Sequence, residues 1–202
     1  MAHTMVLAVS PHHLEQLDAL VTSHRDAEEQ WMRDQSARTD LPLLRGSARR
    51  DAQARIRAAR QKHRDTGRHR PTRALALAPA LRVELDARGL LRDWDPIPAG
   101  APTSGQTLGG RGPHTGAGLT ARLVVALPDE LWVPLTRGVH WTNQPHLQAL
   151  QTWTDRWGPG PAAGHSTAPA EALAERARSA AHITTTGEII RTALEHTLHP
   201  GP

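Results

Sequence analysis

The sequence predicts a mainly α-helical protein with one or two short strands. We expect a helical N-terminal region, a flexible Pro/Gly linker and a small α+β C-terminal region. Apolar residues recur at helical spacing in several stretches, Pro and Gly are dense at 95–118, and one β-branched run occupies 119–127. A chain of 202 residues can form one or two small domains. We expect a helical basic region at 10–94 and a strand-helix region at 119–200.

The first predicted helix follows Ser10-Pro11, because serine is a good N-cap and proline fits the first helical position. One side of this helix is mainly apolar and the other is acidic. The apolar side contains Leu14, Leu17, Leu20, Val21, His24, Trp31 and Met32, and Glu28 interrupts it. The helix either packs on its neighbours or serves as a short dimerising helix, because positions 14, 17, 21, 24, 28 and 31 follow heptad spacing.

A second helix is predicted from Gly46-Ser47 to about Arg64, with its basic residues on one side. An arc of about 100° on the helical wheel contains Arg49, Arg50, Gln53, Arg57, Arg60 and Arg64. The opposite side is thin and apolar, with Ala48, Ala52, Ile56 and Ala59. A row of guanidinium groups suits DNA phosphates or a major groove. It also suits pairing with the acidic first helix, and the two interpretations are compatible if DNA displaces that helix.

The remaining predicted elements are shorter. A helix should end at Arg88, before Gly89, and the apolar run at 119–127 should form a strand that ends at Pro128. Three further helices are predicted from Pro145 to Trp157, over 170–181, and after Thr185. Thr185 is a good N-cap for the last of these helices, because Glu188 completes a capping box three residues later.

Basic residues are concentrated in one stretch of the chain. Residues 38–73 contain twelve Lys/Arg and three acids, a local charge of +9, whereas the whole chain carries +4. Arg68 and Arg70 extend this block beyond the second helix as a basic turn. A basic block of this kind predicts a polyanionic partner, most directly DNA, with RNA as the alternative.

The composition argues against several kinds of chemistry. The chain has no Cys and no Tyr, which excludes thiol nucleophiles, thiolate metal sites and tyrosine-linked DNA cleavage. Its 13 histidines lack metal-site spacing, and no catalytic motif is present. We therefore expect no enzyme activity, no metal and no cofactor. We also expect a cytoplasmic protein without membrane contact, because no signal peptide is recognisable and no stretch approaches the ~20 apolar residues of a membrane span.

Two segments resemble the ribbon-helix-helix family of DNA-binding proteins. Leu123–Leu127 with the following Pro-Asp-Glu-Leu is similar to the family's strand and helix entry, and Ile183–Leu198 is similar to its second helix. The resemblance implies a homodimer whose paired strands enter the major groove. Arg122 on the strand would then read bases. Thr185 and Thr186 would hold the phosphate backbone at the start of the second helix.

The sequence thus predicts a non-enzymatic DNA-binding protein. We expect a regulator or maintenance factor of a plasmid or other mobile element in a GC-rich bacterium, since codons for the missing residues are AT-rich. One alternative is a protein–protein adaptor or antitoxin-like binder whose basic helix docks on an acidic protein. A second alternative is a terminal protein, suggested by a fainter similarity to the proteins that cap linear replicons in actinobacteria. Because the chain has no Tyr, the hydroxyl of a Ser or Thr would have to attach the DNA.

Overall fold

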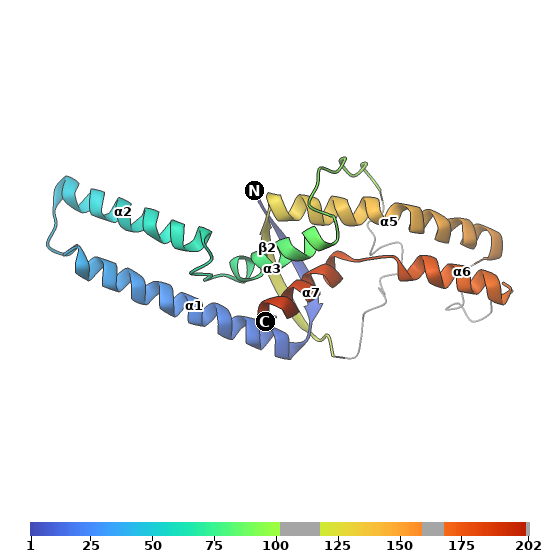
Figure 1. The fold of residues 1–202 in the computed structure, drawn as a ribbon, viewed down its shortest axis with the longest axis horizontal. Coiled ribbons are helices and arrows are strands. Elements are labelled where there is room, and N and C mark those ends of the chain that lie inside the picture. Colours follow the sequence, from blue (N-terminus) through green and yellow to red (C-terminus); the bar gives the residue numbers. More distant parts are fainter. Residues whose placement is uncertain (102–117, 159–167, 201–202) are drawn as a thin grey trace. The chain divides into compact units, whose positions relative to one another are not determined.

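The computed structural model describes residues 1–101, 118–158 and 168–200, and Figure 1 shows its elements. In chain order these are β1 (Ala2–Val9), α1 (Pro11–Arg38), α2 (Gly46–Asp65), α3 (Arg73–Ala87), β2 (Ala121–Pro128), α5 (Asp129–Trp157), α6 (Ala170–Ala181) and α7 (Thr186–Leu198). The predicted fold class is confirmed, because the structure is mainly helical with a two-stranded antiparallel sheet. Most of the expected linker at 95–118 lies outside the described residues.

The chain divides into two compact units. The hairpin unit comprises Ala2–Leu81, Gly118–Leu127 and the described part of Ala193–Pro202. The α5 unit comprises Met1 and the described parts of Arg82–Ala117 and Pro128–Thr192. Each unit therefore combines residues from both of the segments that the sequence suggested as separate regions, 10–94 and 119–200.

The hairpin unit contains the sheet, in which β1 pairs with β2. Alternate residues of both strands are buried, as a pleated strand requires: Leu7 and Val9 in β1, and Leu123, Val125 and Leu127 in β2. Side chains between them point to the other face, where Val6 and Val124 are 58% and 46% exposed. The predicted strand at 119–127 is confirmed. It buries only one face, although its sequence is almost continuously apolar.

In the same unit, α1 and α2 run antiparallel to one another as a helical hairpin (Figure 1). α1 begins at Pro11, as predicted, and α2 covers the predicted basic helix. The thin apolar stripe of α2 is its inner side, because Ala52 and Ile56 are its buried residues. Leu17 and Val21 are buried in α1.

The α5 unit is dominated by a 29-residue helix that the sequence predicted only in part. We expected a helix from Pro145 onward, but α5 begins at Asp129 and continues through both Pro134 and Pro145. Each proline removes one backbone hydrogen bond from the helix. Burial of Leu131 and Leu135 on one side of the helix offsets that loss.

α6 lies alongside α5, with the bounds that the sequence predicted (Figure 1). The Trp153 indole joins the two helices, since its Nε1–H donates to the Ala172 carbonyl over 2.7 Å. Trp153, Ala168 and Ala172 form a small buried cluster. The predicted cap of α7 is also confirmed, because the Glu188 N–H donates to Thr185 Oγ1 over 3.1 Å.

Candidate nucleic-acid interface

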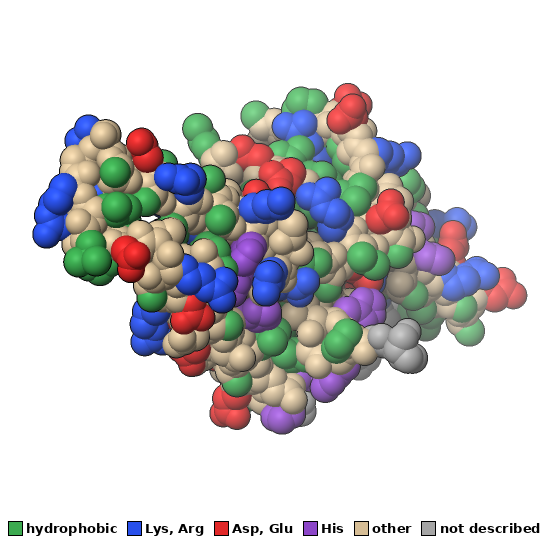
Figure 2. All heavy atoms as spheres, turned by 60° about the vertical axis from the view of Figure 1, so that its left-hand side comes forward, with side chains coloured by type: hydrophobic (Ala, Val, Ile, Leu, Met, Phe, Trp, Pro, Cys, Tyr) green, Lys and Arg blue, Asp and Glu red, His purple; other side chains and the backbone are tan. Residues whose placement is uncertain are grey.

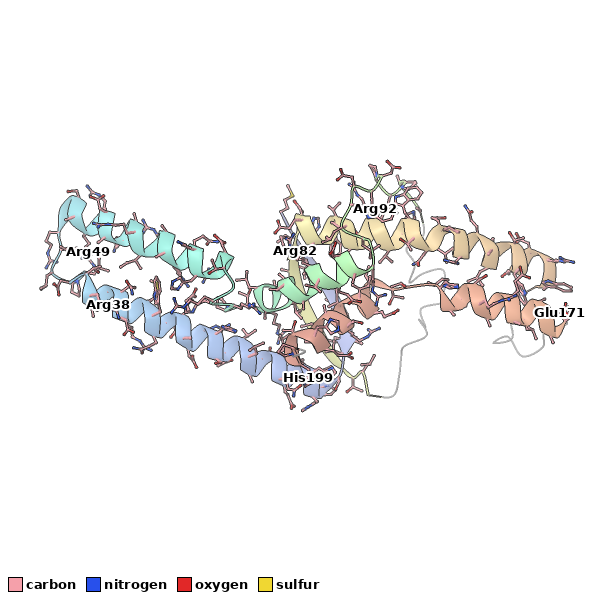
Figure 3. All side chains as sticks on the ribbon, in the orientation of Figure 1. Arg38, Arg49, Arg82, Arg92, Glu171 and His199 are labelled. Atoms are coloured by element: carbon pink, nitrogen blue, oxygen red, sulfur yellow. The ribbon has the colours of Figure 1, made fainter. Side chains whose placement is uncertain are left out.

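α2 carries the predicted row of arginines, but the structure divides this row along the helix axis. In the N-terminal half Arg49, Arg50 and Arg57 are exposed, and they form no salt bridge within the part of the chain that the structure describes. Gln53 lies between them and is half-buried. Arg49 is found near the end of the hairpin at which α1 and α2 connect (Figure 3). Figure 2 shows Lys and Arg side chains at the surface of the face that it presents.

In the C-terminal half of α2, Arg60 and Arg64 turn toward a carboxylate of α1. Arg60 Nη2 donates to Glu28 Oε2 over 2.7 Å, while Arg64 binds both Glu28 oxygens over 2.7 and 2.8 Å. The Glu28 side chain is only 3% exposed. Hydrogen bonds from Arg64 and then Arg60 lower the pKa of Glu28 to about 2, against the opposing effect of burial. Glu28, which interrupts the apolar side in the sequence, is therefore the ion-pair centre of the hairpin.

One of the two interpretations of the arginine row, pairing with the acidic first helix, holds for the C-terminal half of α2. Pairing with the acidic first helix holds for Arg60 and Arg64, and also for Arg73, which binds Asp18 over 2.7 Å through both Nε and Nη2. These are three of the twelve basic residues in 38–73. The other nine have no such carboxylate partner among the described residues. Most of the excess positive charge thus stays available to a partner molecule.

The N-terminus of α2 adds to the exposed positive charge. No side chain caps this end of the helix, and its first turn contains no acidic residue. The N-cap position is Arg45, and Arg49 and Arg50 follow it by four and five residues. Backbone N–H groups at an uncapped N-terminus and the positive end of the helix dipole both attract anions. The guanidinium groups and the helix end consequently favour the same kind of ligand.

The basic turn after α2 is only partly exposed. Arg68 is exposed, whereas Arg70 is half-buried and folds back over Gly67. Gly67 has φ +72, and a Cβ at this position would lie 3.1 Å from Arg70 Nη2. Glycine fits here because the backbone is in the left-handed region and the guanidinium needs the space. Of the two predicted contact residues, Arg68 is the accessible one.

Beside this turn lies a cluster of aromatic rings that the sequence did not predict. The His63 and His69 rings stack with centroids 5.1 Å apart, and the Trp31 ring lies 4.6 Å from that of His63. His69 is buried, and neither of its ring nitrogens has a hydrogen-bond partner in the described structure. Burial, followed by the charge of His63, lowers the pKa of His69, and Glu28 acts in the opposite direction.

Acid should therefore loosen the hairpin unit. An unfolded His69 binds a proton as the pH falls through about 6.5, whereas the folded protein resists protonation at that pH. The free energy of unfolding should decline as the pH decreases from 7.5 through 6 and below. The protection factors of residues 46–70, which compare hydrogen exchange with the intrinsic exchange rate at each pH, should fall across this range. His69→Gln should flatten the pH dependence of the free energy of unfolding, whereas His12→Gln, at an exposed position, should leave it unchanged. An equal pH dependence in both variants would contradict the assignment to His69.

The predicted contact residues outside the basic block lie in different units. Arg122 is exposed on the outward face of β2, in the hairpin unit. Thr185 and Thr186 are half-buried at the start of α7, in the α5 unit, and the Thr185 hydroxyl already caps the helix. The partner strand of β2 is β1 of the same chain, whereas the ribbon-helix-helix resemblance implies a strand from a second copy.

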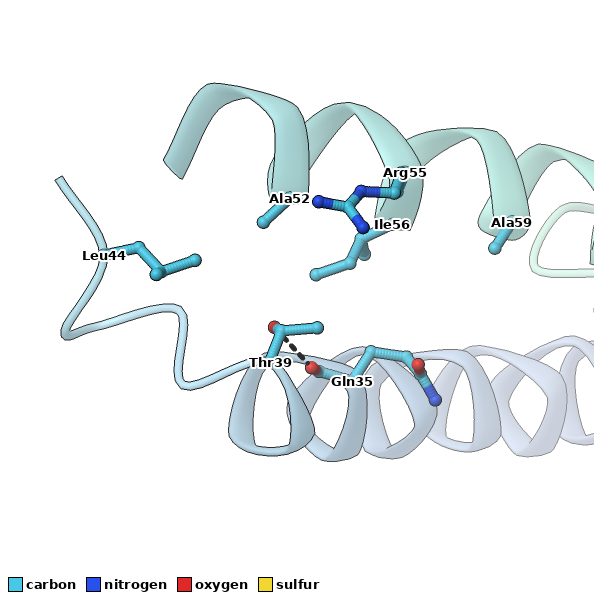
Figure 4. Close-up of a pocket in the computed structure, with 7 residues that line it drawn as sticks. All are labelled: Gln35, Thr39, Leu44, Ala52, Arg55, Ile56 and Ala59. Carbon is cyan, nitrogen blue, oxygen red and sulfur yellow. Dashed lines mark hydrogen bonds between the residues drawn. The ribbon is translucent and has the colours of Figure 1, made fainter. Parts of the chain in front are cut away.

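An apolar hollow of about 370 Å³ separates the two helices near the hairpin's connecting end (Figure 4). Its lining comes from both helices and their connection: Gln35, Thr39, Leu44, Ala52, Arg55, Ile56 and Ala59. The hollow remains because the side chains of α2 on this side are mainly alanines, which are too small to reach α1. Three of these seven residues, Gln35, Thr39 and Arg55, are polar, and the other four are apolar.

The part of the chain that the structure describes was also compared with the needs of a metal site and of a membrane span. No group of three or more His, Asp or Glu side chains there is placed to hold a metal ion. None of the helices described is long and apolar enough to cross a membrane.

Comparisons with protein-family models, with curated proteins and with solved structures find no match to this chain. The proposed function rests, for that reason, on the geometry and charge of the hairpin unit.

Proposed function

We propose that the protein binds DNA, without catalysing a reaction, through the N-terminal half of α2. The observation that carries this proposal is the exposed set Arg49, Arg50 and Arg57, which has no carboxylate partner in the described structure. The three residues span about 12 Å along the helix axis. The uncapped helix end beside them is a second anion-binding feature. Arg68 adds an exposed cation just after the helix.

The arrangement supports backbone recognition more than base reading. Arginine side chains and helix N-termini are typical phosphate ligands, which position a protein on DNA without reading its sequence. Gln53, the side chain in the row best suited to a base edge, is half-buried. The ribbon-helix-helix resemblance suggests a more specific role, as a regulator or maintenance factor of a mobile element. In that role Arg122, Thr185 and Thr186 would be additional DNA contacts.

The test is the salt dependence of binding to a duplex of random sequence. Each phosphate contact contributes about 0.9 to the slope of log K against log salt concentration. Replacing Arg49, Arg50 and Arg57 together with Gln should therefore reduce the slope by up to about three units. Fluorescence anisotropy between roughly 50 and 500 mM salt, a range of about one decade, measures this slope.

A matched control loses the same charge elsewhere. The triple change Arg82→Gln, Arg156→Gln and Arg178→Gln alters exposed arginines of the α5 unit and should keep the slope of the unchanged protein. Equal slopes for all three proteins would remove α2 from the interface. If the unchanged protein binds no nucleic acid and instead captures an acidic protein in a salt-sensitive manner, the adaptor function replaces the proposal.

A further inference from the structure

Within the α5 unit, the segment after α3 fixes the positions of two tryptophans. One, Trp94, belongs to this segment and packs on α5, and the other, Trp141, belongs to α5. Trp94 Nε1–H donates to the Leu90 carbonyl over 2.9 Å, and its indole lies directly on Gly138 of α5. A Cβ at Gly138 would be 3.0 Å from both the Trp94 indole and the Leu90 side chain. Glycine is thus needed at this position of the helix for the close approach. The Trp94 ring is consequently anchored to the helix surface.

The second indole is anchored by the same segment. Trp141 Nε1–H donates to the Asp95 carbonyl over 2.8 Å, and Arg137 Nη1 donates to the Trp94 carbonyl over 3.1 Å. The polar edges of both indoles are therefore satisfied by the protein itself. Their ring faces are what remains for a ligand.

A hollow of about 440 Å³ lies between these groups and is lined by Arg92, Asp93, Trp94, Asp95 and Trp141. This volume falls within the range of small-ligand sites. Asp93 and Asp95 are exposed and form no salt bridge among the described residues. Arg92, whose position on the segment after α3 is labelled in Figure 3, places its guanidinium carbon 3.8 Å from the centre of the Trp94 ring.

Arg92 shows which chemical group this hollow accepts. Apart from Arg92, the lining residues are two tryptophans and two aspartates, and indole faces with carboxylates nearby attract organic cations rather than phosphate. A guanidinium is the best match, because it stacks flat on an indole and donates to carboxylates at its edge. We propose that the hollow binds an arginine side chain of another polypeptide, and that Arg92 occupies the Trp94 face until that side chain displaces it.

This site is independent of the proposed DNA interface, which lies in the hairpin unit. Its ligand is a cation rather than a polyanion, and its groups belong to the α5 unit. The protein would therefore contact nucleic acid through one unit and an arginine-bearing protein through the other. A failure of either proposal leaves the other standing.

The test uses the full chain and N-acetyl-arginine amide as probe. The six tryptophans yield six indole N–H signals in a heteronuclear NMR spectrum, which the changes Trp94→Phe and Trp141→Phe assign. The probe should shift the Trp94 and Trp141 signals selectively. N-acetyl-citrulline amide, which has the same shape without the charge, should bind at least about three-fold more weakly, because the cation–π attraction is lost.

The decisive variant is Arg92→Ala, which removes the internal competitor from an exposed position. We expect it to bind the arginine probe about three-fold more tightly than the unchanged protein. The double change Asp93→Asn and Asp95→Asn should weaken binding by a similar factor. Arg156→Ala is the matched control. The guanidinium carbon of Arg156 lies 4.9 Å from the centre of the Trp157 ring, and neither residue lines this hollow. The proposal is overturned if Arg92→Ala binds no more tightly, if citrulline binds equally well, or if other indoles respond instead.

Discussion

Replacing Glu28 with Gln should lower the free energy of unfolding of the hairpin unit by roughly 3 kcal/mol at neutral pH. The folded protein lowers the pKa of this carboxyl from 4.5 to about 2, and each unit is equivalent to about 1.4 kcal/mol. Little of this is lost to solvent, because the Glu28 side chain is 3% exposed. The change also leaves Arg60 and Arg64 partly buried without their carboxylate, which is costly for an ion pair. Hydrogen exchange over residues 46–65 and urea unfolding would measure the loss.

The neighbouring Glu29 offers a matched control. It lies on the same helix and is exposed, so Glu29→Gln removes the same charge and should change the stability by no more than a few tenths of a kcal/mol. Because the pKa of Glu28 is lowered in the folded state, its stabilisation is present above pH 4.5. It disappears as the pH falls from 4.5 toward 2. The unchanged protein and the Glu28 variant should therefore converge in acid; equal losses in both Gln variants at pH 7 would contradict the ion-pair assignment.

The same substitution connects stability to the proposed function. Arg60 and Arg64 are withheld from DNA by Glu28 in this structure. Without that carboxylate, both guanidinium groups become available, and the salt dependence of DNA binding should steepen by up to about two units. A less stable protein that binds DNA with a steeper salt slope would be hard to explain by general disruption. It would show that α1 and DNA compete for the same half of α2.

Elements with strong local signals could be predicted from the sequence. The bounds of α6, the basic helix α2 and the Thr185 cap of α7 all depend on residues within a few positions of one another. Helical periodicity and capping preferences act over this range. The side of α2 that becomes buried was predictable for the same reason, because its alanines and Ile56 recur at helical spacing.

Features that depend on distant residues could not be predicted. β1 is a short alternating segment whose partner, β2, lies more than a hundred residues away in the chain. α5 continues through two prolines because tertiary burial outweighs local propensity. The Glu28 site needed the knowledge that positions 32 and 36 residues later face it. A lone carboxylate on an apolar helix side, with unmatched arginines on the next helix, was the signal that could have revealed it.

Asn143, the only asparagine of the chain, should be the most sensitive polar residue of the α5 unit. Its side chain is fully buried. Nδ2 donates to the Thr184 carbonyl over 2.7 Å, and Oδ1 accepts from the Thr184 N–H over 3.1 Å. This pair of bonds ties α5 to the backbone just before α7. Asn143→Asp keeps the shape but replaces the donor with an acceptor that faces a carbonyl.

We expect Asn143→Asp to lower the free energy of unfolding by about 3 kcal/mol or more at pH 7, because one buried acceptor loses its donor and a charge is buried without a partner. Urea unfolding and hydrogen exchange over residues 183–190 would measure this. Gln148→Glu, the same chemical change at an exposed position of α5, should cost no more than about 0.5 kcal/mol. Burial should raise the pKa of the new carboxyl. Acid should then restore part of the lost protection from hydrogen exchange around residue 184, because a protonated Asp can donate to the Thr184 carbonyl. If the loss of stability is the same in acid, packing rather than the missing donor is responsible.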